Sequence, residues 1–261
     1  MRRICLFAGY DAQNKVQDYV VYLVKKLSLI SDVYYMGNSH LPTDELSKLV
    51  PYTKLADTCA HQQRCFGSWQ RLIALLGWEN LLRYDELILC NDSVYGPFQN
   101  LENIFKTMKG RGYDFWSMTA DSAYDFHLHN YFMVFSAAVI RNRVFQNFWS
   151  SIPRYSVIYN CSFELTPLLL DEGFVGNSYI RGYRNENIMQ QPQKMVHNFK
   201  LPFVKTKSFL PHNKYTAGSG LALRYRIRTQ SNYDTGLINA HIKANNLPQS
   251  WGQKLAILSG L

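Results

Sequence analysis

The sequence predicts an α/β fold in which a mostly parallel sheet is flanked by helices. Short apolar segments alternate with segments of helical periodicity over residues 1–120, a pattern typical of βαβ units. Hydrophobic residues make up 47% of the 261 residues and charged residues 18%, which excludes a disordered chain. The sequence has no internal repeat and no linker-like stretch, so we expect a single domain with a looser, basic C-terminal extension.

The strands are predicted from short apolar runs bounded by polar residues or glycine. Arg3–Gly9 is such a run ending in glycine, and Glu86–Cys90 is another. Weaker patterns predict strands at Asp32–Gly37, Lys54–Cys59, Tyr113–Met118, Tyr131–Phe135 and Leu221–Thr229. The last of these would place Arg224, Arg226 and Arg228 on one face, because alternate strand residues point the same way.

The helices are predicted from apolar residues that recur every third or fourth position. Asn14–Ile30 has the clearest periodicity, and Thr43–Val50 must end before Pro51. Further helices are expected at Gly67–Gly77, Trp78–Arg83, Leu101–Lys109, Ala137–Ser150, Phe163–Glu172 and Thr235–Asn245, with a last short one from Pro248.

Cysteine usage and hydropathy indicate the compartment. The cysteine count is odd and no CxxC pair occurs, so buried thiols in a reducing compartment are expected at Cys5, Cys59, Cys65, Cys90 and Cys161. No apolar run approaches the roughly 18 residues of a membrane-spanning helix. The apolar stretch Ile4–Gly9 is too short for a signal peptide, so we expect a cytoplasmic protein.

The positive charge is concentrated in one segment. The chain has 28 basic and 19 acidic residues, a net charge of +9. Between Arg181 and Arg228 Glu186 is the single acid, against ten basic residues: Arg181, Arg184, Lys194, Lys200, Lys205, Lys207, Lys214, Arg224, Arg226 and Arg228. This segment, residues 181–228, predicts either an anionic partner (nucleotide phosphates, a lipid head group or a nucleic acid) or a solvated surface.

A candidate binding site follows the strand Glu86–Cys90. Ligands of open α/β sheets bind at the carboxyl ends of the strands, and Asn91, Asp92 and Ser93 come directly after this one. A carboxylate there can hold a divalent cation or a ribose hydroxyl. The alternative is a simple turn in which Asp92 or Ser93 caps the next segment.

Other candidate residues have two interpretations each. His127 and His129 have a spacing that could ligate a metal on a strand, or they are two ordinary loop histidines. Glu164 lies early in its predicted helix, where its negative charge would interact favourably with the helix dipole. Alternatively, it projects into a cleft as a general base. No GxGxxG or GxxxxGK[ST] motif occurs, so neither a dinucleotide cradle nor a P-loop is indicated.

Several segments, taken in order, carry a family resemblance. They are Cys5–Asp11, Val16–Lys25, Asn38–Leu41, Phe66–Trp69, Tyr84–Phe98, Asp114–Thr119, His127–Phe135 and Pro202–Lys205. The most specific is NDSxYGP, with YDELIL before it and YFxVF after it. Together they resemble the rhamnan synthesis protein F family, glycosyltransferase-like proteins of bacterial rhamnan and O-antigen assembly, over about residues 3–245.

The resemblance implies a GT-A-like, nucleotide-sugar-dependent glycosyltransferase. Residues 1–120 would bind the nucleotide sugar and residues 121–261 would form the acceptor side. Asn91, Asp92 and Ser93 would stand where GT-A enzymes carry their Asp-x-Asp motif. Asp92 would then bind Mn²⁺ or Mg²⁺ and, with it, the donor diphosphate. The remaining implied roles are donor contacts from Gly9, Tyr10, Asp11, Arg64 and Gly67, acceptor contacts from Trp116, His127 and His129, and a catalytic base in Glu164 or Asp121.

The resemblance also implies a reaction and partners. L-rhamnose would pass from dTDP-rhamnose to a lipid-linked glycan, with inversion by direct displacement, and the basic segment would hold the protein on the inner face of the cytoplasmic membrane. This chain has Cys65 where the family commonly has aspartate, which favours a second hypothesis, a sugar-binding or scaffold protein without catalysis. A nucleic-acid-binding protein is the third, although no helix-turn-helix, zinc-finger or RNP motif occurs.

Overall fold

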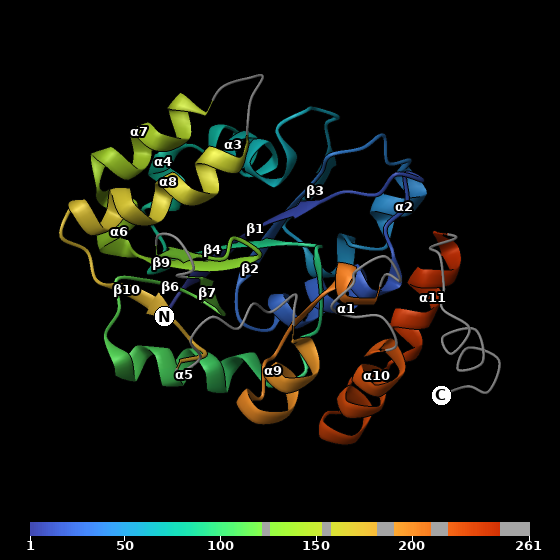
Figure 1. The fold of residues 1–261 in the computed structure, drawn as a ribbon. Coiled ribbons are helices and arrows are strands. Elements are labelled where there is room, and N and C mark those ends of the chain that lie inside the picture. Colours follow the sequence, from blue (N-terminus) through green and yellow to red (C-terminus); the bar gives the residue numbers. More distant parts are fainter. Residues whose placement is uncertain (122–125, 153–157, 182–190, 210–218, 246–261) are drawn as a thin grey trace.

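The computed structural model describes residues 1–121, 126–152, 158–181, 191–209 and 219–245. In this part of the chain, seven strands form one central sheet in the order β10-β6-β9-β4-β1-β2-β3 (Figure 1). They are β1 (Arg3–Gly9), β2 (Asp32–Gly37), β3 (Leu55–Thr58), β4 (Glu86–Asn91), β6 (Phe115–Ser117), β9 (Phe132–Ser136) and β10 (Gly176–Ser178). β9 is antiparallel to β4 and β6, and all other neighbours are parallel, so the predicted α/β class is confirmed.

β1 is an interior strand of the sheet and its residues are apolar on both faces. Ile4 to Ala8 are all buried, and β1 pairs in parallel with β2 on one side and β4 on the other. A parallel strand covered on both faces has no polar side to show to water, so its sequence is a continuous apolar run rather than an alternation. The same reason accounts for the predicted strand at Glu86–Cys90, which the structure extends to Asn91.

Helices cover both faces of the sheet (Figure 1). One face packs against α3 (Arg64–Leu76), α4 (Trp78–Leu81), α6 (Ala137–Arg141), α7 (Arg143–Ser151) and α8 (Ile158–Asp171). The other face packs against α1 (Asp18–Ser28), α5 (Leu101–Arg111), α9 (Pro192–Phe199), α10 (Ser219–Gln230) and α11 (Gly236–Ala244). Two short helical elements, α2 (Thr43–Ser47) and η1 (Val50–Tyr52), connect β2 to β3.

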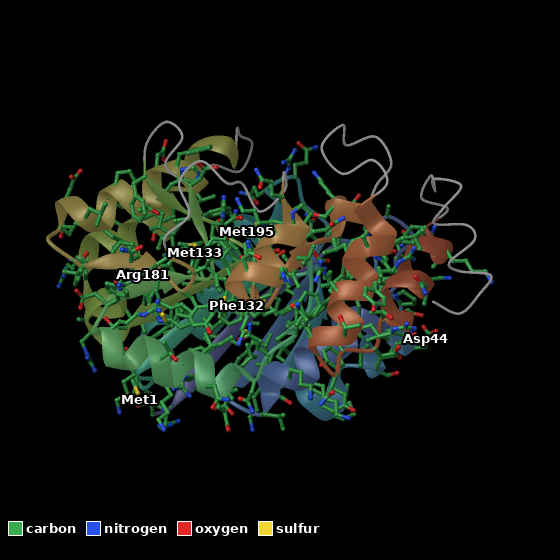
Figure 2. All side chains as sticks on the ribbon, turned by 60° about the horizontal axis from the view of Figure 1, so that its bottom comes forward. Met1, Asp44, Phe132, Met133, Arg181 and Met195 are labelled. Atoms are coloured by element: carbon green, nitrogen blue, oxygen red, sulfur yellow. The ribbon has the colours of Figure 1, made fainter. Side chains whose placement is uncertain are left out.

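The two faces form two separate cores, as adjacent residues of β9 show. Phe132 belongs to the core on the α5 and α9 side, together with Met195, whereas Met133 belongs to the core on the α3 side. All three residues are labelled in Figure 2, where side chains fill the space on either side of the sheet. Alternate burial on opposite faces is the expected consequence of the strand's two-residue period.

Asparagine side chains cap the N-termini of two helices. Asn100 accepts hydrogen bonds from the backbone amides of Glu102 and Asn103 at the start of α5. Asn142 accepts one from the amide of Phe145 at the start of α7. This cap divides the predicted helix Ala137–Ser150 into α6 and α7, because a capping residue has extended rather than helical backbone angles.

The prediction of a strand at Leu221–Thr229 is wrong, because this segment lies within helix α10. Basic and apolar residues alternate here, which imitates a strand, but Leu223 and Ile227 are one helical turn apart and both are buried in the core. Packing against α9 therefore overrides the local pattern. The three arginines do not share a face: Arg224 is buried, whereas Arg226 and Arg228 are more exposed.

Two short antiparallel strand pairs lie outside the central sheet. β5 (Val94–Tyr95) pairs antiparallel with β11 (Val204–Lys205), which leads into η2 (Thr206–Phe209). β7 (Ala120–Asp121) pairs with β8 (His127–Leu128). The helix predicted from Pro248 lies outside the described residues. None of the helices in the described ranges has the length and apolar character needed to span a membrane.

Candidate active site

The candidate site lies where β1 and β4 end side by side. β1 has β2 as its other neighbour and β4 has β9, so the connections diverge at this point of the sheet. The backbone amide of Tyr10, just after β1, donates a hydrogen bond to the Asp92 carboxylate, with 2.5 Å between nitrogen and Oδ2. Such a switch point is where open α/β sheets bind ligands, so the structure puts Asp92 at the expected edge.

The turn after β4 is held by its own side chains. Oδ1 of Asn91 accepts hydrogen bonds from the Ser93 amide at 3.1 Å and the Ser93 hydroxyl at 2.6 Å. The Asn91 amide group donates to the carbonyl oxygen of Asn130 at 3.4 Å. Below the turn, the Tyr19 hydroxyl donates to the Asp92 carbonyl oxygen at 2.8 Å. Asn91 therefore positions its neighbours, and Asp92 is left as the carboxylate of the turn.

Lys205 is a site residue that the predicted site residues did not include. Its Nζ lies 3.1 Å from the Ser93 hydroxyl oxygen and 4.5 Å from the ring centre of Tyr131. It reaches the turn because β11 pairs with β5, where Lys205 is opposite Val94. The one signal in the sequence was the segment Pro202–Lys205, which by itself is a weak motif.

The acid and the base of this site have shifted pKa values. Burial raises the pKa of Asp92 from 3.8 to about 7, although the hydrogen bond from the Tyr10 amide opposes the rise. Burial lowers the pKa of Lys205 from 10.5 to about 8. Burial also raises the pKa of Cys65 to about 11, so this thiol adds no negative charge at neutral pH. Lys205 thus brings a cation into a site with little compensating charge.

His127 and His129 lie on the β8 side of the site. The Nδ1 atom of His129 lies 2.7 Å from the Thr119 hydroxyl, which lies 2.9 Å from the Tyr131 hydroxyl. Burial lowers the pKa of His129 to about 3, so its ring is uncharged. The two imidazole rings are 5.8 Å apart, but the structure, as far as it describes the chain, holds no cluster of three or more His, Cys, Asp or Glu side chains for a metal.

The predicted residues near β1 lie at the same edge. Gly9 ends the strand against the Tyr35 ring, where a Cβ atom would collide with the tyrosine hydroxyl. Tyr10 is exposed and only its backbone contacts Asp92. The Asp11 carboxylate is buried and binds its own loop, accepting hydrogen bonds from the amides of Gln13 and Lys15. Asp11 therefore shapes the loop that a donor would contact.

The remaining donor and acceptor candidates differ in exposure. Arg64 is exposed at the first position of α3, whereas Gly67 is buried in that helix against His61 and Gln63. Trp116 is 3% exposed and packs against Phe105 and Phe132. We therefore correct the predicted acceptor-side position of Trp116: it is a core residue of β6, because its side of that strand faces α5.

The two candidate bases lie on neighbouring elements. Asp121 is opposite His127 in the β7–β8 ladder, and its charge acts on His129, as does that of Lys205. Glu164 is exposed on α8, which is tied to β8 by a hydrogen bond from the Leu128 amide to the Thr166 hydroxyl. Since α8 begins at Ile158, Glu164 is not in the first turn and the predicted helix-dipole role is wrong.

Comparison with known proteins adds the family. The family model of rhamnan synthesis protein F matches residues 33–258. The chain belongs to the rhamnan synthesis protein F family. This membership confirms the resemblance and supports a transferase of polysaccharide synthesis. No curated protein sequence matches the chain.

Two solved structures illustrate distant similarity to this rhamnan synthesis protein F family member. A putative nucleotide-diphospho-sugar transferase from Desulfovibrio desulfuricans has 10% identity and a TM-score of 0.41, covering 88% of this chain and 99% of its own. The glycosyltransferase GlyE of Streptococcus pneumoniae has 14% identity and a TM-score of 0.47, over 95% of this chain and 65% of its own.

The residues present do not fit the Mn²⁺ or Mg²⁺ that was predicted at Asp92. Hard divalent cations prefer several oxygen ligands, often two carboxylates. Here one oxygen of Asp92 already accepts the Tyr10 amide and Oδ1 of Asn91 is bound to Ser93. The ammonium of Lys205, on the Ser93 hydroxyl, would repel a cation at the same place.

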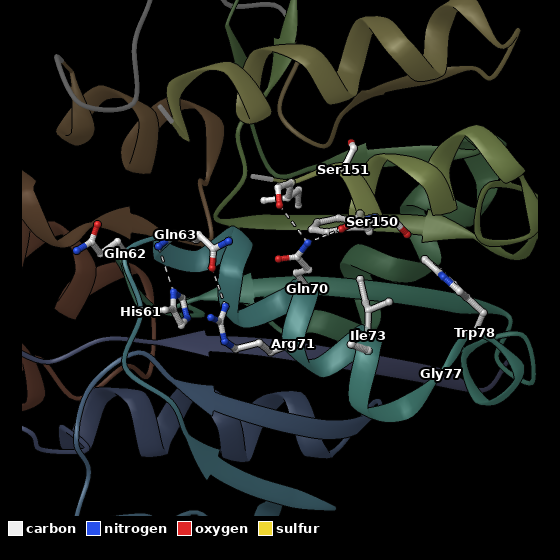
Figure 3. Close-up of a pocket in the computed structure, with 13 residues that line it drawn as sticks. His61, Gln62, Gln63, Gln70, Arg71, Ile73, Gly77, Trp78, Ser150 and Ser151 are labelled. Atoms are coloured by element: carbon white, nitrogen blue, oxygen red, sulfur yellow. Dashed lines mark hydrogen bonds between the residues drawn. The ribbon is translucent and has the colours of Figure 1, made fainter. Parts of the chain in front are cut away.

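A second feature of this family member is a cleft of about 1080 Å³ along α3 (Figure 3). Its walls are the outer face of α3 and the end of α7, and Gln70 joins them by donating to the carbonyl oxygens of Trp149 at 2.8 Å and Ile152 at 3.3 Å. Arg71 is held by the Gln63 side chain at 2.8 Å. The cleft also includes His61, Gln62 and Trp78, and it does not include Asp92.

Proposed function

We propose that this protein is a GT-A-like glycosyltransferase that moves a sugar from a nucleotide donor to a growing cell-surface polysaccharide. One observation carries the proposal: at the switch point of the sheet Lys205 contacts Ser93, the neighbour of Asp92, and the charge of Asp92 acts on Lys205. The family membership supports the polysaccharide context. Residues 1–120 would contribute the nucleotide side and residues 121–261 the acceptor side, with Lys205 reaching back across the site.

The donor would lie over the ends of β1 and β4. Gly9, Tyr10 and Asp11 would shape one wall, and Arg64, which is exposed at the start of α3, would contribute a further donor contact. The diphosphate would lie beside Ser93 and Lys205. As the bond between the sugar and the diphosphate breaks, negative charge grows on the leaving oxygen, and a fixed ammonium stabilises that charge more than it stabilises the bound donor.

Asp121 is the catalytic base that the geometry favours. The charges of Asp121 and Lys205 both act on His129, so both lie on the same side of the site, whereas Glu164 is exposed on α8. In an inverting reaction the Asp121 carboxylate takes the proton of the acceptor hydroxyl and the hydroxyl oxygen bonds to the anomeric carbon. The nucleoside diphosphate leaves with the electrons of the broken bond. L-rhamnose, from dTDP-rhamnose, is the sugar that the family name suggests.

The acceptor would be a lipid-linked glycan at the cytoplasmic membrane face. Exposed cations of residues 181–228, such as Lys200, Lys207 and Arg228, support attraction to an anionic surface. Arg224 and Lys205 belong to the core and the site, and Arg184 and Lys214 lie outside the described residues. The membrane proposal therefore rests on fewer residues than the sequence suggested.

Calorimetry with dTDP-rhamnose, and with UDP- and GDP-sugars as comparators, tests the donor site. We expect one donor to bind and the Asp92→Ala variant, in which the Tyr10 amide loses its carboxylate acceptor and the loop after β1 is no longer held, to bind it less tightly, while Asp18→Ala, an exposed change on α1, leaves binding intact. If no donor binds to the wild-type protein, the catalytic proposal fails and the scaffold hypothesis replaces it.

A further inference from the structure

We propose that the ammonium group of Lys205 supplies the positive charge that holds the donor diphosphate, so that this protein binds nucleoside diphosphates without a divalent cation. The inference rests on the proposed function and states how its donor site works. It starts from the mismatch between the predicted metal and the residues at Asp92.

Lys205 is fixed in the site by backbone as well as side-chain contacts. Its strand pairs with β5, and the next residue, Thr206, donates its amide hydrogen to the Ser93 carbonyl oxygen at 2.9 Å. The Lys205 side chain then crosses the Tyr131 ring and donates to the Ser93 hydroxyl. A flexible lysine is thus held at the turn after β4, where the donor phosphates are expected.

The cation has no carboxylate partner of its own in the described part of the chain. Three ion pairs occur there and none includes Lys205. Asp92 is the carboxylate whose charge acts on it, and burial brings the pKa of Asp92 to about 7, so its charge is incomplete at neutral pH. Cys65 is an uncharged thiol. A partly buried cation without a full countercharge is costly, and a diphosphate would supply that charge.

Calorimetry in EDTA, with UDP, GDP and dTDP as probes, tests the inference. We expect at least one of them to bind in EDTA, and added Mn²⁺ to change the affinity by less than about threefold. Lys205→Met should weaken binding by about tenfold to a hundredfold, the range of a charge-assisted hydrogen bond. Lys109→Met is the matched control, because it removes an exposed lysine charge on α5. Its affinity should equal that of the wild type.

The outcomes separate this inference from the proposed function. Nucleotide binding that requires Mn²⁺, or a Lys205→Met variant with unchanged affinity, overturns the inference and leaves the glycosyltransferase proposal standing. Absence of nucleotide binding with and without Mn²⁺ overturns both. Circular dichroism of the Lys205→Met variant shows whether it is folded. Lys205→Arg, which keeps the charge, should retain more affinity than Lys205→Met if the charge is what matters.

An independent observation, the cleft along α3, carries a second inference. We infer that this cleft binds an uncharged oligosaccharide segment of the acceptor, which also rests on the proposed function. The described residues of its lining include no carboxylate, and burial lowers the pKa of His61 to about 4, so that the ring is neutral. Neutral amides, an arginine and an indole remain, a combination that suits the hydroxyl groups and apolar faces of sugars.

The cleft is built before a ligand arrives. The side-chain nitrogen of Gln70 donates hydrogen bonds to the carbonyl oxygens of Trp149 in α7 and of Ile152 just after it, which leaves the side-chain oxygen as an acceptor. The Arg71 guanidinium is oriented by hydrogen bonds to the Gln63 side chain and the Gly67 carbonyl oxygen. Trp78 packs edge-on against Phe145 with ring centres 6.1 Å apart. The first turn of the same helix carries Cys65, on which the charges of Asp92 and Lys205 act, so a glycan in the cleft would lead toward the donor site.

Saturation-transfer NMR with a neutral rhamnan oligosaccharide tests the cleft without any donor. We expect Trp78→Ala and Arg71→Met each to weaken binding by about tenfold, while Leu75→Ala, exposed on α3 but outside the cleft, has no effect. Binding of UDP, GDP and dTDP, measured by the calorimetry described above, should be unchanged in all three variants. Oligosaccharide binding that neither cleft variant alters, or no binding to the wild type, overturns this inference alone.

Discussion

At the scale of single residues, buried polar side chains determine how the site responds to pH. His129 is enclosed by Thr119 and Tyr131 and remains neutral because burial lowers its pKa to about 3. An imidazole with so low a pKa is a poor proton acceptor near pH 7, which is a further reason to assign the base to Asp121. His129 then acts as a neutral support for the wall of the site.

His129 should make the protein less stable in acid. Between about pH 3 and pH 6.5 the unfolded chain binds a proton at this position and the folded chain does not, so stability falls as the pH falls through this window. In His129→Gln the loss between pH 6.5 and pH 5 should be smaller by about 2 kcal/mol. Urea unfolding at both pH values measures it, with the exposed His40→Gln as control. Equal losses in wild type and variant would contradict the expected burial.

The choice of base is tested by two isosteric changes. Asp121→Asn should lower the rate of sugar transfer by about a hundredfold or more and leave donor affinity unchanged, because it removes only the proton acceptor. Glu164→Gln should change the rate by less than about threefold. Steady-state kinetics with saturating donor gives both values, and a reversed order would assign the base to Glu164.

At the scale of elements, the helical conformation of α10 determines which of its basic residues are exposed and could bind an anionic membrane surface. As a helix it buries Arg224, whose guanidinium donates to the Asn239 side chain on α11, and leaves Arg228 exposed. Two further nitrogens of Arg224 are buried without a hydrogen-bond partner in the described structure. Charge in the sequence therefore overstates the charge that the surface presents.

Binding to anionic vesicles should distinguish the arginines. Arg228→Gln should weaken sedimentation with phosphatidylserine vesicles at low salt by about fivefold, the equivalent of about 1 kcal/mol per surface cation. Arg224→Met should leave it unchanged, provided that thermal melting shows the variant to be folded. Vesicle binding that is indifferent to Arg228 and to salt would contradict the membrane proposal.

At the scale of the whole molecule, aromatic side chains join the α3 layer to the sheet beneath the site. Trp69 is fully buried, and its indole nitrogen donates to the Cys90 carbonyl oxygen at 3.1 Å, next to Asn91. It packs edge-on against Phe66 and Trp149, which link α3 to α7. The position of the turn after β4 thus depends on helix packing on the far side of the sheet from Lys205.

Trp69 should be among the most sensitive core positions. Trp69→Ala should lower the free energy of unfolding by about 3–5 kcal/mol, because it opens a large cavity and leaves the Cys90 carbonyl without its donor. Trp69→Phe should cost less, since most of the volume remains. Denaturant unfolding gives both values, and a loss below about 1 kcal/mol for the alanine variant would contradict this packing.

The central strands and the position of the donor edge could be predicted from the sequence. β1 and β4 are buried on both faces, so their apolar runs are local signals, and Asp92 follows directly after one of them. The tertiary structure alone decided three matters: Lys205 joins Ser93 through β11, Trp116 faces the core, and α10 is helical. Each depends on contacts between residues far apart in the chain. Such contacts leave no local signal for Lys205 and Trp116, and in α10 packing against α9 decides between the helical spacing of Leu223 and Ile227 and the strand-like alternation around them.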